Sequence, residues 1–96
     1  MTNIIRNFSF TVNPEAAASF HHDGIVILHT GKGRLFTSNE TGARIWRGIE
    51  QQLPLEAIAE QISGEYNITR TTAREQAGRF LAELERHNLI QREALS

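Results

Sequence analysis

The stretch from residue 23 to residue 46, DGIVILHTGKGRLFTSNETGARIW, places the strongest constraint on how this chain can fold. Ile25 to Thr30 begins with the continuous apolar run IVIL, which is typical of a strand, and we assign this run to the core. Gly31-Lys32-Gly33 supplies the glycines that a tight turn uses, so we expect Arg34 to Ser38 to be a short return strand at a sheet edge. Asn39 is a favourable N-cap, which predicts that a helix follows directly.

Two segments before the hairpin are candidate strands. Phe8 to Val12 alternates apolar and polar residues and ends at Asn13-Pro14. Ala16 to His22 could pair with the segment that follows it, although alanine is a poor strand former. Either segment could be the first strand of the sheet, and the sequence leaves this choice open. We therefore divide the chain into an N-terminal extension or extra strand, residues 1–15, and a main domain, residues 16–96.

Three helices are expected after the hairpin. Trp46 is the predicted core anchor of the first. The second is expected to start at Pro54, since proline is tolerated in a first turn, and to stop at Gly64. Thr69 is a second N-cap, for a third helix from about Arg70 to His87. Two or three strands followed by three helices predict an α+β fold, winged-helix-like, with a small antiparallel sheet of about three strands.

Composition excludes several classes of protein. Ninety-six residues suit a single domain, and the absence of cysteine rules out disulfides and thiolate metal sites. The net charge of −1 argues against bulk nucleic acid as a partner, although the mildly basic hairpin could orient an acidic one. No apolar run approaches a membrane span, and the N-terminus lacks the apolar core of a signal peptide. We expect a soluble, cytoplasmic protein.

The sequence contains no convincing catalytic constellation. His21 and His22 are adjacent in a strand-like segment and would point to opposite faces, so we interpret them, with His29 nearby, as solvated loop histidines rather than metal ligands. Ser38 has no nucleophile elbow or oxyanion motif around it. The glycines of the turn lack the Lys-Ser/Thr and helix of a phosphate loop. We therefore predict no enzymatic activity, no cofactor and no metal.

Binding remains, and it could take two forms. A winged-helix DNA-binding protein would place a helix in the major groove and use the hairpin as a wing. Arg70, Arg74 and Arg79 favour this form weakly, but glutamates on the same helix and the lack of a basic patch oppose it. Alternatively, the edge strand Arg34 to Ser38 could pair with an extended peptide through its free backbone groups. A third class, an enzyme subunit that shares its active site with a partner, would show activity only in the complex.

The hairpin and its helix also resemble a known family. Asp23 to Leu28, Thr30 to Phe36 and Asn39 to Trp46 together resemble the PqqD-like family, named for the pyrroloquinoline quinone biosynthesis protein D. The downstream segments LEAIA, YNI and FLAEL fit the same family. The resemblance covers roughly Ala17 to Arg92, and its most specific part is residues 39–46.

The resemblance implies a RiPP recognition element, a domain that binds the leader segment of a ribosomally made precursor peptide. In that family the leader adds as a strand to the third strand of the sheet, in a groove that the third helix also lines. Apolar leader residues would enter pockets beside Phe36 and Leu81, and Arg34 or Arg74 would pair with an acidic one. No nucleic acid or membrane partner is implied. Carried onto this chain, the peptide-binding residues are Arg34, Leu35, Phe36, Thr37, Ser38, Arg70, Arg74, Ala77, Gly78 and Leu81.

The chain departs from the family pattern in two places. Ser38 stands where relatives usually carry leucine, so the end of the strand is expected to be less buried. Met1 to Pro14 has no clear counterpart. A free-standing domain of this size resembles the leader-binding protein of a lasso-peptide pathway, in which a separate protease removes the leader. It equally resembles a peptide chaperone for a radical S-adenosylmethionine enzyme, so the partner is a modifying enzyme or a leader peptidase.

Overall fold

The computed structural model describes residues 8–94, so residues 1–7 of the expected N-terminal extension lie outside the described residues. In the described residues, four strands come first, three helices follow them, and a fifth strand comes last. Their order is β1 (Phe8–Val12), β2 (Ala16–His21), β3 (Gly24–His29), β4 (Arg34–Asn39), α1 (Glu40–Glu50), α2 (Leu55–Tyr66), α3 (Arg70–Arg86) and β5 (Ile90–Ala94).

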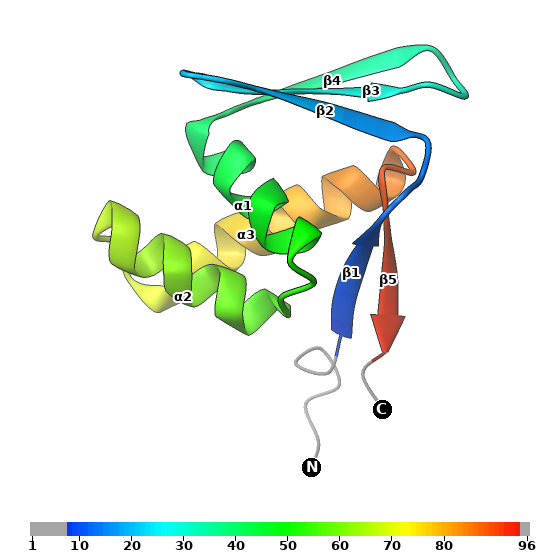
Figure 1. Cartoon of the computed structure of the whole chain (residues 1–96). Helices are drawn as coiled ribbons and strands as arrows, with labels where there is room; N and C mark the ends of the chain where they lie inside the picture. Colours follow the sequence, from blue (N-terminus) through cyan, green and yellow to red (C-terminus); the bar gives the residue numbers. More distant parts are fainter. Residues whose placement is uncertain (1–7, 95–96) are drawn as a thin grey trace.

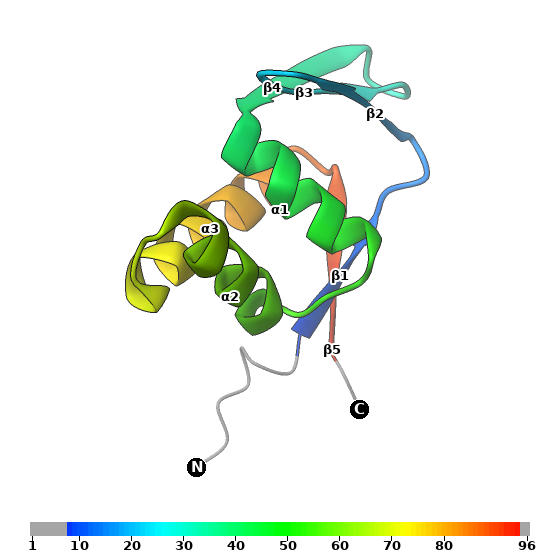
Figure 2. The same cartoon turned by 60° about the vertical axis from the view of Figure 1, so that its left-hand side comes forward.

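The main sheet is antiparallel, has the strand order β2-β3-β4 and leads into three helices, which confirms the predicted α+β fold. All three helices lie on one face of this sheet, with α1 directly beneath it (Figures 1 and 2). The first strand of the sheet is β2 and not β1, which settles the choice that the sequence left open.

A second, two-stranded sheet joins β1 to β5. In its register Val12 lies opposite Ile90, and Phe10, from the middle of β1, is buried in the core. The Asn13 side chain donates a hydrogen bond to the carbonyl of Asn88 (2.7 Å) and so ties the start of the main sheet to the end of α3. The sequence predicts no strand at β5, because IQREA has no apolar alternation; its pairing with β1 decides its conformation.

The core lies between the inner face of the sheet and the helices. Trp46 of α1 is 1% exposed, as predicted, and its indole N–H donates to the Glu50 carboxylate (3.1 Å). On β3, Ile25 and Ile27 are fully buried, but Leu28 is 37% exposed. Assigning the whole IVIL run to the core was therefore wrong at Leu28. Helices cover only one face of the sheet, so alternate residues of β3 face away from the core.

Side-chain caps fix the starts of two helices. The Asn39 side chain accepts a hydrogen bond from the Gly42 N–H (3.0 Å), and Thr69 accepts one from the Thr72 N–H (3.1 Å), so both predicted N-caps are confirmed. The predicted stop at Gly64 is wrong. Helix α2 continues to Tyr66 because Asn67, with φ of 55°, supplies the left-handed C-cap.

The cap at Asn39 joins β4 directly to α1, so its loss should loosen both elements. We expect Asn39→Ala to lower the free energy of unfolding by about 1 kcal/mol, whereas Asn39→Ser, which keeps a cap oxygen, should lower it by less than half as much. Urea unfolding monitored by Trp46 fluorescence measures both values. Equal losses in the two variants would show that the cap is not the source of the stability.

Candidate peptide-binding site

Among the strands that the structure describes, β4 pairs only with β3 and so forms one edge of the main sheet. The Thr30 N–H donates to the Glu15 carbonyl (2.8 Å) at the start of the β2–β3 ladder. Since hydrogen-bonded pairs alternate along an antiparallel ladder, this bond sets which backbone groups of β3 point toward β2. They are those of Gly24, Val26 and Leu28, and the groups of the residues between them point toward β4.

The same alternation assigns the backbone groups of β4. Phe36 lies opposite Ile27 and Ser38 opposite Ile25, so the amides of Phe36 and Ser38 point toward β3. The amides and carbonyls of Leu35 and Thr37 then point away from the sheet, toward solvent. An extended peptide laid along β4 would find donors and acceptors at these two residues.

Side chains of β4 divide between the two faces of the sheet. Leu35 lies on the outer face and is 68% exposed. Phe36 lies on the inner face and is half-buried against α3, with its ring centroid 5.9 Å from that of Phe80 and 5.3 Å from that of His87. Ser38 is also half-buried. Phe36 therefore forms the floor where the edge of the sheet meets α3.

Two hollows lie along this junction. The larger, about 440 Å³, is next to the α1 N-terminus, and the smaller, about 110 Å³, is next to the β3–β4 turn. The larger is lined by Ser38, Asn39, Thr41, Gly42, Ile45, Gln76, Arg79 and Phe80. The smaller is lined by His29, Lys32, Arg34, Leu35, Phe36, Arg86, His87 and Leu89.

The smaller hollow is basic. Lys32, Arg34 and Arg86 line it, and no carboxylate does. Arg86 also pairs with Glu83, which lies just outside the lining. The hollow can therefore accept a negatively charged group at the turn end of β4.

His29 supports the turn beneath this hollow. It is only 4% exposed, so interpreting it as a solvated loop histidine was wrong. Its Nδ1 accepts a hydrogen bond from the Lys32 N–H (3.2 Å), which holds the turn together with the bond from the Gly33 N–H to the His29 carbonyl (2.8 Å). Of the two turn glycines, only Gly33 has a positive φ, +62°.

None of the five predicted helix residues lines either hollow. Arg70 and Arg74 approach the Glu56 carboxylate of α2, at 4.0 and 2.9 Å. Ala77 and Leu81 are buried in the core, and neither they nor Gly78 line either hollow. Of the predicted strand residues, Arg34, Leu35, Phe36 and Ser38 each line one of the hollows, and Thr37 lines neither.

A different set of residues from α3 and its C-cap lines the two hollows. These are Gln76, Arg79, Phe80, Arg86 and His87. Helical spacing from Phe80 could have indicated part of this set, because residues three or four apart share one side of a helix. Peptide binding by any of these residues stays a prediction.

Within residues 8–94, no three histidine, aspartate or glutamate side chains gather in a way that could hold a metal ion. Among the same residues, no helix combines the length and apolar character needed to cross a bilayer. The arrangement beside β4 consists of open backbone groups, an aromatic floor and cations, and these are features of a binding surface.

Comparison with known proteins gives one family and two related structures. Residues 24–90 match the family model described as coenzyme PQQ synthesis protein D (PqqD). The solved structure of TbiB1 in complex with the TbiA(β) leader peptide is 27% identical, with a TM-score of 0.79, over 84% of this chain and 94% of that one. A lasso peptide synthetase B1 complexed with the leader peptide is 22% identical, with a TM-score of 0.78, over 85% and 96%. No curated protein matches.

Two helical glycines should respond oppositely to alanine. A Cβ at Gly42 would lie 2.7 Å from the Ser38 Cβ and 3.1 Å from the Phe80 Cζ, whereas a Cβ at Gly78 would meet nothing within 4 Å. We expect Gly78→Ala to raise the free energy of unfolding by up to about 1 kcal/mol through helix propensity. Gly42→Ala should lower it by about 1 kcal/mol or more through overpacking. Urea unfolding of both variants tests this, and a stabilised Gly42→Ala would contradict the close packing of β4, α1 and α3.

Proposed function

We propose that this chain, which belongs to the PqqD family, binds the leader segment of a ribosomally synthesised precursor peptide by strand addition to β4. The observation that carries the proposal is the edge position of β4, with the backbone groups of Leu35 and Thr37 open to a partner. The matched region, residues 24–90, includes β3, β4 and all three helices, and therefore the whole junction. TbiB1, the 27% identical relative, was solved with a leader peptide.

Strand addition would let β4 read alternate residues of the leader. Hydrogen bonds to Leu35 and Thr37 fix the register, so every second leader side chain points inward toward α3. An apolar leader residue would rest on Phe36 and Phe80, which already contact each other. We thus replace the expected pocket beside Leu81 with one beside Phe80, because Leu81 is only 2% exposed.

The basic hollow at the turn end of β4 would select an acidic leader residue. Arg34 stays in the proposal, and Arg86 takes the place of Arg74 because Arg86 lines the hollow. Arg74 does not line it and lies against Glu56 of α2. We also propose Gln76 and Arg79 as polar contacts at the opposite end of the junction. The proposed site therefore keeps the five predicted strand residues and moves its helical side to the face that carries Phe80.

The proposed role is delivery without catalysis. A bound leader would hold the rest of the precursor near a modifying enzyme or a leader peptidase, and the chain itself would need no cofactor. Likeness to a lasso peptide synthetase B1 supports a lasso-peptide pathway over a radical S-adenosylmethionine system. We place this delivery in the cytoplasm, where the ribosome supplies the precursor.

No observation favours DNA binding. The cations that would approach a duplex from α3 are largely paired with carboxylates: Arg70 and Arg74 with Glu56, and Arg86 with Glu83. The net charge of −1 gives no general attraction to phosphates.

Removing either outward donor of β4 should weaken strand addition. Proline at Leu35 or Thr37 removes a backbone N–H that faces solvent. It breaks no hydrogen bond to β3, so the fold should persist. We expect Leu35→Pro and Thr37→Pro each to weaken leader binding by about tenfold or more. The measurement is fluorescence anisotropy with the leader of a co-encoded precursor, beside a scrambled peptide and a DNA duplex.

Matched variants that keep these amides are Leu35→Ala and Thr37→Val, and they should bind within about threefold of the natural chain. Circular dichroism confirms that each protein is folded. The assignment of β4 fails if the folded proline variants bind the leader as tightly as the matched ones. Equal binding of leader and scramble would remove the support for sequence-specific recognition.

The charge of the small hollow gives a second test. Arg34→Gln and Arg86→Gln should each weaken leader binding by about two- to fivefold, and more at low salt, because both cations are partly exposed. Arg70→Gln and Arg74→Gln remove the same charge from the α2 side of α3 and should have little effect. Anisotropy titrations at two salt concentrations compare the four variants. If leader binding weakens in the Arg70→Gln and Arg74→Gln variants instead, the result would favour the helix residues first predicted from the sequence.

A further inference from the structure

Within residues 8–94, β2 forms the second open edge of the main sheet. The alternation that leaves Leu35 and Thr37 open on β4 also leaves the backbone groups of Ala16, Ala18 and Phe20 facing away from β3. Natural edge strands are usually protected from pairing by lysine, proline or a bulge. None of these occurs in β2, whose sequence AAASFH pairs with β3 without interruption. The strand is therefore a suitable template for another strand.

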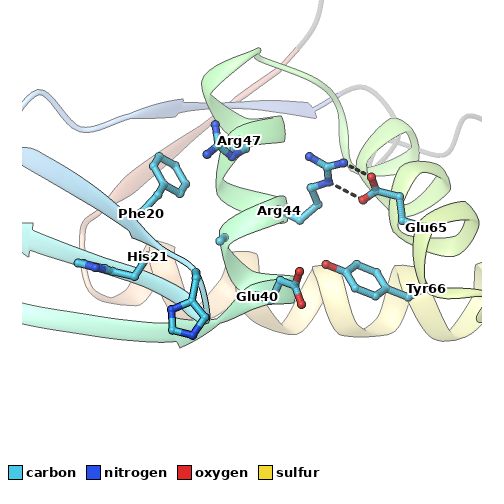
Figure 3. Close-up of a pocket in the computed structure, with 9 residues that line it drawn as sticks. Phe20, His21, Glu40, Arg44, Arg47, Glu65 and Tyr66 are labelled. Carbon is cyan, nitrogen blue, oxygen red and sulfur yellow. Dashed lines mark hydrogen bonds and ion pairs between the residues drawn. The ribbon is translucent and has the colours of Figure 1, made fainter.

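Space is available beside this edge. A hollow of about 480 Å³ lies between the end of β2, α1 and α2 (Figure 3). Phe20 borders the hollow, and the Arg47 guanidinium lies 4.0 Å from its ring centroid. Ala16 and Ala18 share the inner face with Phe20 but carry only methyl groups. These small side chains would let another backbone approach closely.

We propose that β2 is a self-association surface, on which β2 of a second copy of this chain pairs antiparallel across a two-fold axis. Ala18 would lie opposite Ala18 of the second copy, and Ala16 opposite Phe20. This places the largest side chain of the strand against one of the smallest. On the outer face, Ala17 would lie opposite Ser19, and Glu15 opposite His21, so no like charges oppose each other.

Neighbouring registers are less favourable. Outward backbone groups occur at every second residue, so a slip moves the two copies by two positions. One slip places Phe20 opposite Pro14, which has no N–H to donate. The other places Glu15 opposite Asp23 of the second copy, and these two carboxylates would repel each other. The register centred on Ala18 is thus the one that combines full pairing with charge complementarity.

The resulting sheet would run continuously through both copies, with the two β4 strands at its outer edges. Peptide addition to β4 would remain possible in the dimer, and the proposal does not rest on peptide binding. Since only one short strand from each copy forms the contact, the association should be weak and depend on concentration.

Charges introduced at exposed positions test the surface without disturbing the core. Ala17 and Ser19 are exposed and would face each other across the axis. Ala17→Glu with Ser19→Glu should weaken the dimer by about tenfold, because like charges then oppose each other twice. Ala17→Lys with Ser19→Glu places opposite charges there and should dimerise at least as well as the natural chain. Sedimentation velocity over a concentration series, with no peptide present, measures all three.

Cysteine crosslinking locates the contact, because the natural chain has no cysteine. Ala17→Cys with Ser19→Cys should yield a covalent dimer under mild oxidation, since opposed residues of paired strands lie within disulfide reach. Leu35→Cys with Thr37→Cys, at the same spacing on β4, is the matched control and should give only background. The proposal is overturned if the natural chain stays monomeric throughout the series. It is also overturned if the double-glutamate variant dimerises as well as the natural chain, or if the two cysteine pairs crosslink equally.

Discussion

The pairing of β4 with β3 is the constraint on which the rest of the structure depends. Ile25 and Ile27 are fully buried because helices cover one face of the sheet, so β3 cannot slip by one residue without exposing them. Once β3 is fixed, the register of the hairpin fixes Phe36 as an inward side chain and Leu35 and Thr37 as outward backbone groups. The hydrophobic core thus determines which parts of β4 a partner can reach.

Helix α3 and strand β4 together form the junction that contains the proposed site. Phe80 contacts Phe36, and Gly42 of α1 lies close enough to both strand and helix that even a methyl group would crowd Ser38 and Phe80. This close packing holds the junction between β4 and α3 at a fixed width, with one hollow on each side of the aromatic floor. Preorganisation of this kind lowers the entropy cost of ordering a bound peptide.

Local signals in the sequence predicted the local features well. The glycine-rich turn, the Asn39 and Thr69 caps and the core position of Trp46 depend on neighbours within a few residues, and all are present. One local signal failed, at Gly64, because Asn67 supplies the C-cap three residues later. The other features that the sequence missed depend on distant partners. Strand β5 forms because β1 pairs with it, and the contact between Phe80 and Phe36 depends on how α3 packs beside β4, which local spacing does not specify. A helical wheel shows which residues share a side, but the packing of neighbouring elements decides which side meets the sheet.

Amide hydrogen exchange of β4, with and without the leader of a co-encoded precursor, tests strand addition most directly. Phe36 and Ser38 amides, which point toward β3, should be protected in both states. Strand addition predicts that the amides of Leu35 and Thr37 exchange rapidly in the free protein and become protected when the leader saturates it. Rapid exchange at both residues in the saturated complex would contradict binding along this edge.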